Sequence, residues 1–156
     1  EFRRVLFRSN GKMNEFCAAL GVTNFESLEY FIDANKRNYL CYKELLSGLP
    51  GVKLMEYNEK EKNNWQYIVV EIDQDQTGIG RDDLISILNS NRTLARKYFW
   101  PGCHRMEPYR SLYPEAGRNL RVTDRIAAKV MVLPTGSEIS QRDVAKICGV
   151  IRNSIQ

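Results

Sequence analysis

The sequence predicts an α+β fold in which two helices lead into a unit of mixed strands and helices. Three observations support this fold class. The 156 residues, 43% hydrophobic and 27% charged, have the makeup of one ordinary soluble domain with a single core. Apolar residues recur at helical spacing near both ends of the chain. Between them, residues 65–72 are apolar on both faces, as in the central strand of a sheet.

Composition and charge exclude several classes of protein. No stretch approaches the roughly 18 to 20 apolar residues of a membrane-spanning helix, so we expect no membrane partner. The formal net charge is +4, but half of the excess lies in residues 1–9, which leaves no ground for a nucleic-acid partner. The four cysteines are far apart and form no Cys-x-x-Cys pair. This usage suits a reducing compartment, and we expect a cytoplasmic protein.

Residues 1–9 look foreign to the rest of the chain. Their segment Val5-Leu6-Phe7-Arg8-Ser9 resembles the translation of a common sequencing adapter, and a clear helix signal follows at once. The segment is too short for a secretory signal, since it has no run of about 7 to 15 apolar residues and no small-residue cleavage site. We interpret it as a non-native scar and expect the remainder to be a piece of a larger protein.

Two helices are predicted in residues 10–48. The first follows Asn10 and is expected to end at Gly21. The second is expected to open with a capping box formed by Thr23 and Glu26, and to end at Gly48. The first helix places one set of apolar side chains on a single face, namely Met13, Phe16, Cys17 and Leu20.

Residues 49–156 alternate between strand and helix signals. In order, the pattern predicts strands at 52–57 and 65–72, a helix at 81–88, a strand at 93–99, an irregular stretch at 100–118, and a helix at 124–130 that leads into the apolar residues 131–133. The last helix has the clearest signal, because Ser140 and Asp143 form a capping box before a continuous apolar stripe. The stripe consists of Val144, Ile147, Cys148, Ile151 and Ile155.

A calcium-binding loop is the first functional candidate. Asp33 and Glu44 lie at positions one and twelve of an EF-hand pattern, but Arg37 occupies a ligand position and Asn38 replaces the turn glycine. A second candidate at residues 73–78 lacks its acidic twelfth residue. We favour a continuous helix across the first candidate and a surface turn at the second. A non-catalytic EF-hand-like calcium-binding or interaction module stays the alternative function.

The long irregular stretch contains the only histidine, and such loops are often functional. His104 follows Cys103, but these two residues are too few for a structural zinc site, which needs about four ligands. They are also poor candidates for a nucleophile and its base, because the side chains of adjacent residues usually point apart. His104 could bind an anionic or hydroxyl-rich ligand, or it could be an ordinary exposed loop residue.

A second candidate lies near the N-terminus. Asn10 and Lys12 lie where a helix is expected to begin, and this position is either an anion site or a plain N-cap.

The order of these motifs resembles one known family. The segments that carry the resemblance are Asn10-Gly11-Lys12-Met13-Asn14-Glu15, Leu49-Pro50-Gly51-Val52, Ala95-Arg96-Lys97-Tyr98-Phe99-Trp100-Pro101, the loop from His104 to Tyr109, and Leu133-Pro134-Thr135-Gly136. From residue 10 onward, the sequence resembles the C-terminal part of the DegT/DnrJ/EryC1/StrS aminotransferases. These pyridoxal-phosphate enzymes transfer amino groups to keto sugars linked to nucleotides.

The resemblance implies a fold and a set of partners. It places residues 10–48 at the end of a large domain and in a long linking helix, and residues 49–156 in the small domain of a fold-type I transferase, with a mainly antiparallel sheet. It implies a homodimer, a nucleotide-sugar substrate from polysaccharide or antibiotic biosynthesis, and an amino-acid donor such as glutamate.

The resemblance also implies site residues. Asn10 and Lys12 match positions that hold pyridoxal 5'-phosphate, while His104 and Tyr109 match a substrate-facing loop. The lysine that forms the Schiff base lies upstream in the family, and no lysine of this chain matches it. We therefore expect the chain to be inactive alone. Whether the whole protein is an aminotransferase or a related dehydratase stays open, because that lysine decides it.

Overall fold

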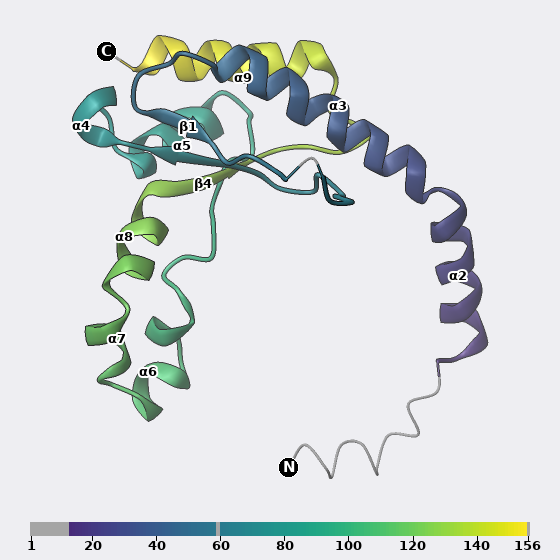
Figure 1. The fold of residues 1–156 in the computed structure, drawn as a ribbon, viewed down its shortest axis with the longest axis horizontal. Helices are drawn as coiled ribbons and strands as arrows, with labels where there is room; N and C mark the ends of the chain where they lie inside the picture. The colour runs from purple at the N-terminus through teal and green to yellow at the C-terminus, as the bar shows by residue number, and fades with distance from the viewer. Residues whose placement is uncertain (1–12, 59, 156) are drawn as a thin grey trace.

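The computed structural model describes residues 13–58 and 60–155, and it confirms the predicted α+β class. In chain order the elements are α2 (Glu15–Glu26), α3 (Leu28–Leu46), β1 (Val52–Leu54), β2 (Ile68–Ile72), α4 (Gln74–Thr77), α5 (Arg81–Ser90), β3 (Arg96–Lys97), the 3-10 helix η1 (Cys103–Arg105), α6 (Tyr109–Leu112), α7 (Ala116–Asn119), α8 (Arg121–Lys129), β4 (Val130–Leu133) and α9 (Gln141–Ser154). Figure 1 shows an arch, with α2 descending on one side of the sheet and α6, α7 and α8 on the other.

The four strands form one sheet in the order β1-β2-β4-β3, and every neighbouring pair is antiparallel. The central strand β2 pairs with β1 through Val70 and Leu54, and with β4 through Val70 and Met131. Its side chains Ile68, Val70 and Ile72 are almost completely buried, as the apolar run predicted. The small antiparallel sheet and the long preceding helix agree with the fold that the resemblance implied.

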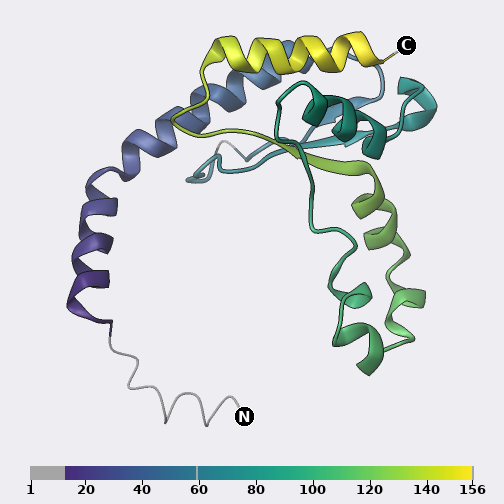
Figure 2. The ribbon, with the colours of Figure 1, turned by 180° about the vertical axis from the view of Figure 1, so that it is seen from behind.

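The core lies between the sheet and the helices α3, α5 and α9, which cover one face (Figures 1 and 2). The predicted capping box of α9 is present. The Asp143 amide donates to Ser140 Oγ at 3.2 Å, and the Ser140 amide donates to Asp143 Oδ2 at 3.1 Å. Four members of the predicted stripe are buried in the core, namely Val144, Ile147, Cys148 and Ile151.

The predicted boundary between the first two helices is wrong, whereas the second helix ends beside Gly48 as predicted, since α3 ends at Leu46 and Gly48 has a positive φ of 75°. The described helix starts at Glu15 with Asn14 as its N-cap, and it passes through Gly21 to Glu26. A mid-helix glycine costs only about 1 kcal/mol relative to alanine, which is too little to end a helix by itself. Thr23 lies inside α2 and its hydroxyl donates to the Ala19 carbonyl at 3.2 Å, so it caps nothing. The break between the helices falls at Ser27 instead.

The calcium-loop alternative does not form at residues 33–44. These residues belong to the uninterrupted helix α3, as we favoured. The Asn38 amide is buried and donates to the Gly136 carbonyl at 3.0 Å, so it fastens the helix to the turn before α9. Residues 74–77 form the short helix α4 rather than a simple turn, and it is closed by Gly78 in the left-handed conformation. Within 13–58 and 60–155, no cluster of three His, Cys, Asp or Glu side chains could hold a metal.

The three strands predicted at 52–57, 65–72 and 93–99 are all shorter than predicted, and the irregular stretch is more ordered. Strand β1 ends at Leu54, β2 begins only at Ile68, and β3 spans only Arg96–Lys97. Two residues after β3, Phe99 turns the backbone with a positive φ of 45°. Residues 100–118 contain η1, α6 and α7. We call residues 100–129, including α8, the arm. In the described residues, no helix has both the length and the apolar character needed to cross a membrane.

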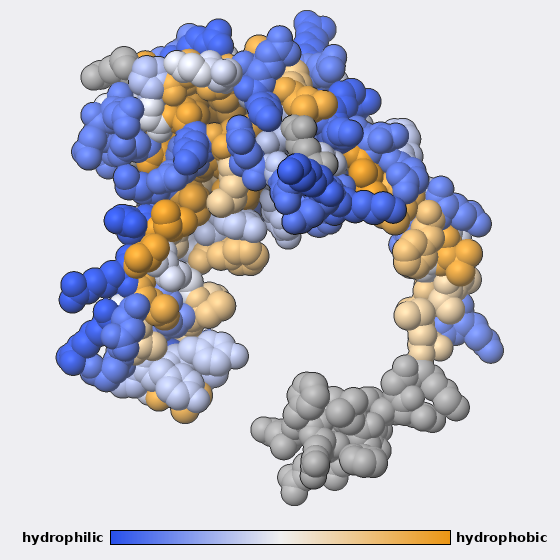
Figure 3. Space-filling model, in the orientation of Figure 1, coloured by the Kyte–Doolittle hydropathy of each residue, from blue (hydrophilic) through white to orange (hydrophobic). Residues whose placement is uncertain are grey.

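Helix α2 carries apolar side chains that nothing in the described chain covers. None of its residues is buried, and Phe16 and Phe25 are 78% and 77% exposed. Figure 3 shows apolar side chains gathered on this helix and again along the arm. Exposed apolar surface of this kind marks a face that contacts another part of a protein or a partner.

Candidate functional site

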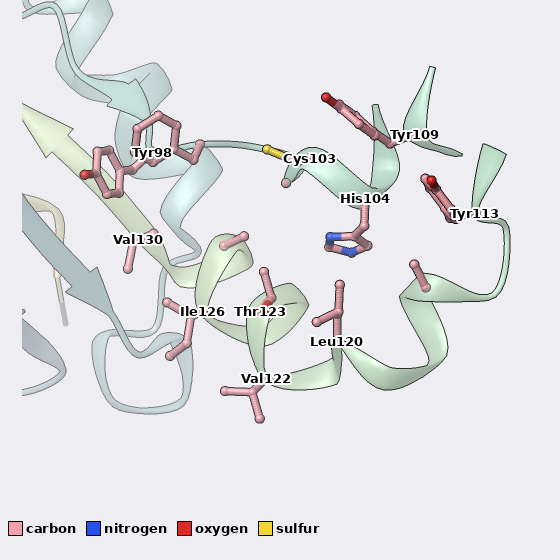
Figure 4. A pocket seen from close by; sticks show the side chains of 14 residues that line it. Tyr98, Cys103, His104, Tyr109, Tyr113, Leu120, Val122, Thr123, Ile126 and Val130 are labelled. Atoms are coloured by element: carbon pink, nitrogen blue, oxygen red, sulfur yellow. The ribbon is translucent and has the colours of Figure 1, made fainter. Parts of the chain in front are cut away.

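His104 and Tyr109, the residues predicted to face a substrate, line the same groove. His104 lies in η1 and Tyr109 begins α6, and the groove between them and α8 has a volume of about 880 Å³ (Figure 4).

The two residues predicted to bind the cofactor, Asn10 and Lys12, lie outside the described residues. Helix α2 begins at Glu15, after Asn14, whose side chain accepts a hydrogen bond from the Cys17 amide at 2.8 Å. It is therefore already capped.

The groove is walled by aromatic and aliphatic side chains. Figure 4 shows Tyr109 and Tyr113 on one side of His104, and Leu120 on the other. The lining residues are Tyr98, Phe99, Gly102, Cys103, His104, Tyr109, Tyr113, Ala116, Leu120, Val122, Thr123, Ile126, Ala127 and Val130. A mostly apolar cavity with a few polar groups is the usual form of a small-molecule site, where the polar groups fix the orientation of the ligand.

The imidazole of His104 is held inside the arm rather than exposed to solvent. Its side chain is only 6% exposed, and Nε2 lies 2.8 Å from Asp124 Oδ1. Gly102 adopts a φ of +95°, and a Cβ on this residue would lie 3.0 Å from the ring atom Cε1. The close approach and the backbone conformation both require glycine here. The exposed-loop interpretation of His104 is therefore wrong.

The carboxylate of Asp124 contacts two side chains, those of Arg105 and His104. Arg105 donates from Nε to Oδ1 at 2.7 Å and from Nη2 to Oδ2 at 2.6 Å, while His104 contacts Oδ1. The Arg105 guanidinium holds the pKa of Asp124 well below its usual range, against a smaller opposing effect of burial, and His104 lowers it further. Among the described residues, no hydrogen bond joins Cys103 to His104, so the two do not form a nucleophile pair.

Asp124 is expected to make the stability of the chain fall in acid. The Asp124 carboxylate binds a proton less readily in the folded state than in the unfolded chain, because folding lowers its pKa. The stabilisation is therefore fully present above about pH 4 to 5 and is lost as the pH falls below that range. Urea unfolding of the chain and of Asp124→Asn, between about pH 7 and about pH 3, should show a stability difference that narrows in acid. A stability difference that does not change with pH would contradict the lowered pKa of Asp124.

Arg81 joins the arm to the sheet and helices. It is 5% exposed, and its Nη1 donates to the carbonyls of Ala127 at 2.9 Å and Val130 at 2.8 Å. Its guanidinium also contacts Asp82 and lies 5.0 Å from the ring centre of Trp100. The start of α5 is thereby fastened to the end of α8. Sequence reasoning missed this residue, since an arginine in the first turn of a helix is normally exposed.

Comparison with solved structures defines the class of protein. The fold matches the corresponding part of known aminotransferases, among them the crystal structure of DesI in the presence of its TDP-sugar product. That structure superposes with a TM-score of 0.83 and 41% identity, over 90% of this chain and 35% of that chain. PseC of Helicobacter pylori has the same fold, with a TM-score of 0.79 and 16% identity over 94% of this chain and 38% of that chain.

The chain belongs to the DegT/DnrJ/EryC1/StrS aminotransferase family, whose model matches residues 2–152. The dTDP-4-amino-4,6-dideoxy-D-glucose transaminase of Escherichia coli is 34% identical over 88% of this chain. The GDP-perosamine synthase of Vibrio cholerae is 27% identical over 92% of this chain. The chain spans 37% and 38% of these two relatives, respectively. The family match starts inside the segment that we interpreted as foreign, and the origin of that segment stays a prediction.

Proposed function

We propose that this chain is the C-terminal part of a cytoplasmic, pyridoxal-phosphate-dependent aminotransferase that acts on a nucleotide-linked keto sugar. The observation that carries the proposal is the 41% identity and TM-score of 0.83 to DesI, a protein crystallised with a TDP-sugar product. The E. coli relative, a sugar-nucleotide transaminase by name, supports the same substrate class. The exposed apolar face of α2 supports a larger protein, because another domain would cover it.

The groove of the arm is the part of the proposed substrate site that this chain supplies. Its aromatic walls offer flat apolar surface to a sugar ring, while Tyr109 and His104 offer polar atoms to the hydroxyl groups. The two site residues come from consecutive elements, η1 and α6, and both line the groove together with residues of α8. The proposed whole protein is a homodimer, with an amino acid such as glutamate as the amino donor.

The position of the described lysines supports a Schiff-base lysine elsewhere in the whole protein. No lysine within the described residues is buried, and none lines the groove. The chemistry that the cofactor supplies when bound is withdrawal of electrons from the carbon that loses its proton. We infer that the lysine belongs to the part of the protein that is missing here, and that the 156-residue chain alone does not transaminate. In this proposal, Asn10 and Lys12 bind the cofactor phosphate in the neighbouring subunit.

A chimera tests the proposed function. The chain would replace the matching C-terminal stretch of the E. coli transaminase, which supplies the large domain. With glutamate and a dTDP-linked 4-keto sugar, the folded chimera is expected to form 2-oxoglutarate and an amino sugar, whereas the 156-residue chain with added cofactor forms neither. A folded chimera that retains cofactor but forms no amino sugar would count against the proposed function, as would activity of the chain alone.

Asn10→Ala should weaken cofactor retention in this chimera. A hydrogen bond to a charged phosphate contributes about 1.5 kcal/mol or more, so the dissociation constant of the cofactor is expected to rise about tenfold. Cofactor release during dialysis, followed by absorbance, measures the change. The matched control is Asn119→Ala, an exposed asparagine at the end of α7, which should leave cofactor affinity unchanged. Equal retention by both variants would remove Asn10 from the site.

A further inference from the structure

Asp124 lies beneath the proposed substrate-facing loop and belongs to none of the motifs that predicted the site. It is in the first turn of α8, 20 residues after His104, and its side chain is 25% exposed. One carboxylate therefore joins η1 to α8 through two different side chains, His104 and Arg105. The contact with His104 determines which ring nitrogen remains for a ligand.

We propose that Asp124 is a positioning residue that keeps the proton of His104 on Nε2 and leaves Nδ1 as the hydrogen-bond acceptor offered to a substrate hydroxyl. A carboxylate can only accept hydrogen bonds, so the ring nitrogen that contacts it must carry a proton. In the neutral ring the second nitrogen is then an acceptor. No described residue hydrogen-bonds to Nδ1. The role as an acceptor for a sugar hydroxyl rests on the proposed function, whereas the position of the proton does not.

The surroundings of the ring make this arrangement hard to change. On one side the ring lies against the backbone of Gly102, where an added Cβ would be 3.0 Å from Cε1 and 3.2 Å from Nδ1. On another side, a Cβ on Gly117 would lie 3.8 Å from Cδ2. Arg105 binds both carboxylate oxygens and so limits rotation of the acceptor. The ring and its acceptor are therefore both held before a ligand arrives, which lowers the cost of binding.

Nuclear magnetic resonance can test the position of the proton directly, since the chain has a single histidine. In the ¹⁵N-labelled 156-residue chain at neutral pH, we expect a ring N–H signal on Nε2 that exchanges slowly with water. Asp124→Ala should speed that exchange at least about tenfold, as expected for loss of a charge-assisted hydrogen bond. Arg105→Gln should keep the slow signal, because it leaves the acceptor of His104 in place. Asp83→Ala, which removes an exposed carboxylate from α5, is the matched control.

Asp124→Asn is a second, more conservative variant, to be measured in case Asp124→Ala disrupts the fold of the arm. An amide oxygen in the Oδ1 position satisfies both His104 and the Nε of Arg105, whereas the reversed amide satisfies only one donor. The asparagine variant should therefore keep the N–H signal on Nε2. A proton found on Nδ1 in the unaltered chain, or equal exchange in the unaltered chain and Asp124→Ala, would overturn the proposal. A failure of the proposed function appears separately, as a chimera that forms no amino sugar although the Nε2 signal persists.

Discussion

Replacement of Arg81 by methionine is expected to lower the free energy of unfolding by about 3 kcal/mol. Methionine fills a similar volume but donates no hydrogen bond, so the carbonyls of Ala127 and Val130 lose their shared donor where α8 meets β4. A buried acceptor left without a partner costs about 1 to 3 kcal/mol. The stacking of the guanidinium on Trp100, at 5.0 Å, is lost as well.

Urea unfolding followed by circular dichroism measures this change. Arg96→Met is the matched control, since Arg96 is exposed on the edge strand β3, and it should change stability by less than about 0.5 kcal/mol. Arg81→Lys should fall between the two, because an ammonium keeps the charge but not the geometry of the guanidinium. Equal stability of Arg81→Met and Arg96→Met would show that Arg81 does not hold the arm.

Tyr42→Ala is expected to destabilise the chain by about 4 kcal/mol, the range typical of a large aromatic side chain removed from a core. Tyr42 is fully buried where α3 meets the sheet and α9, and its hydroxyl donates to the Pro134 carbonyl at 3.0 Å. Burial raises the pKa of this hydroxyl, which therefore stays protonated as a donor across the physiological range.

Two further variants separate packing from hydrogen bonding. Tyr42→Phe removes only the hydroxyl and leaves the carbonyl unpaired, so we expect a loss of about 1 kcal/mol. Tyr30→Ala, on the same helix but 64% exposed, should stay within about 0.5 kcal/mol of the unaltered chain. Thermal or urea unfolding of the three variants gives the comparison. A loss in Tyr42→Ala no larger than in Tyr30→Ala would contradict the placement of Tyr42 in the core.

Local sequence signals predicted the elements whose stability is local. The capping box at Ser140 and the stripe behind it produced α9 where expected, because both interactions span no more than a few turns of one helix. The apolar run predicted the buried strand β2. A single glycine was a weaker signal than these. Gly21 was expected to end a helix, yet α2 continues through it, since one glycine costs too little to outweigh helical hydrogen bonds.

The candidate site was predictable only in part. His104 and Tyr109 were found from loop composition and the family resemblance, and they line one groove. Their role in substrate binding is a prediction. Asp124 was missed, because an acidic residue in the first turn of a helix has an ordinary local explanation. Its partners are 19 and 20 residues away, and nothing in the sequence indicates that the loop folds back on α8.

The sequence by itself determined the α+β class, the long helix α3, the capped final helix and the family. These depend on spacing, capping and the order of motifs, which are properties of neighbouring residues. Only the tertiary structure decided that Arg81 is buried, that the imidazole of His104 contacts Asp124, and that the arm encloses an apolar groove. The physical reason is that each of these depends on the meeting of segments 20 to 49 residues apart, which packing of the whole chain brings about.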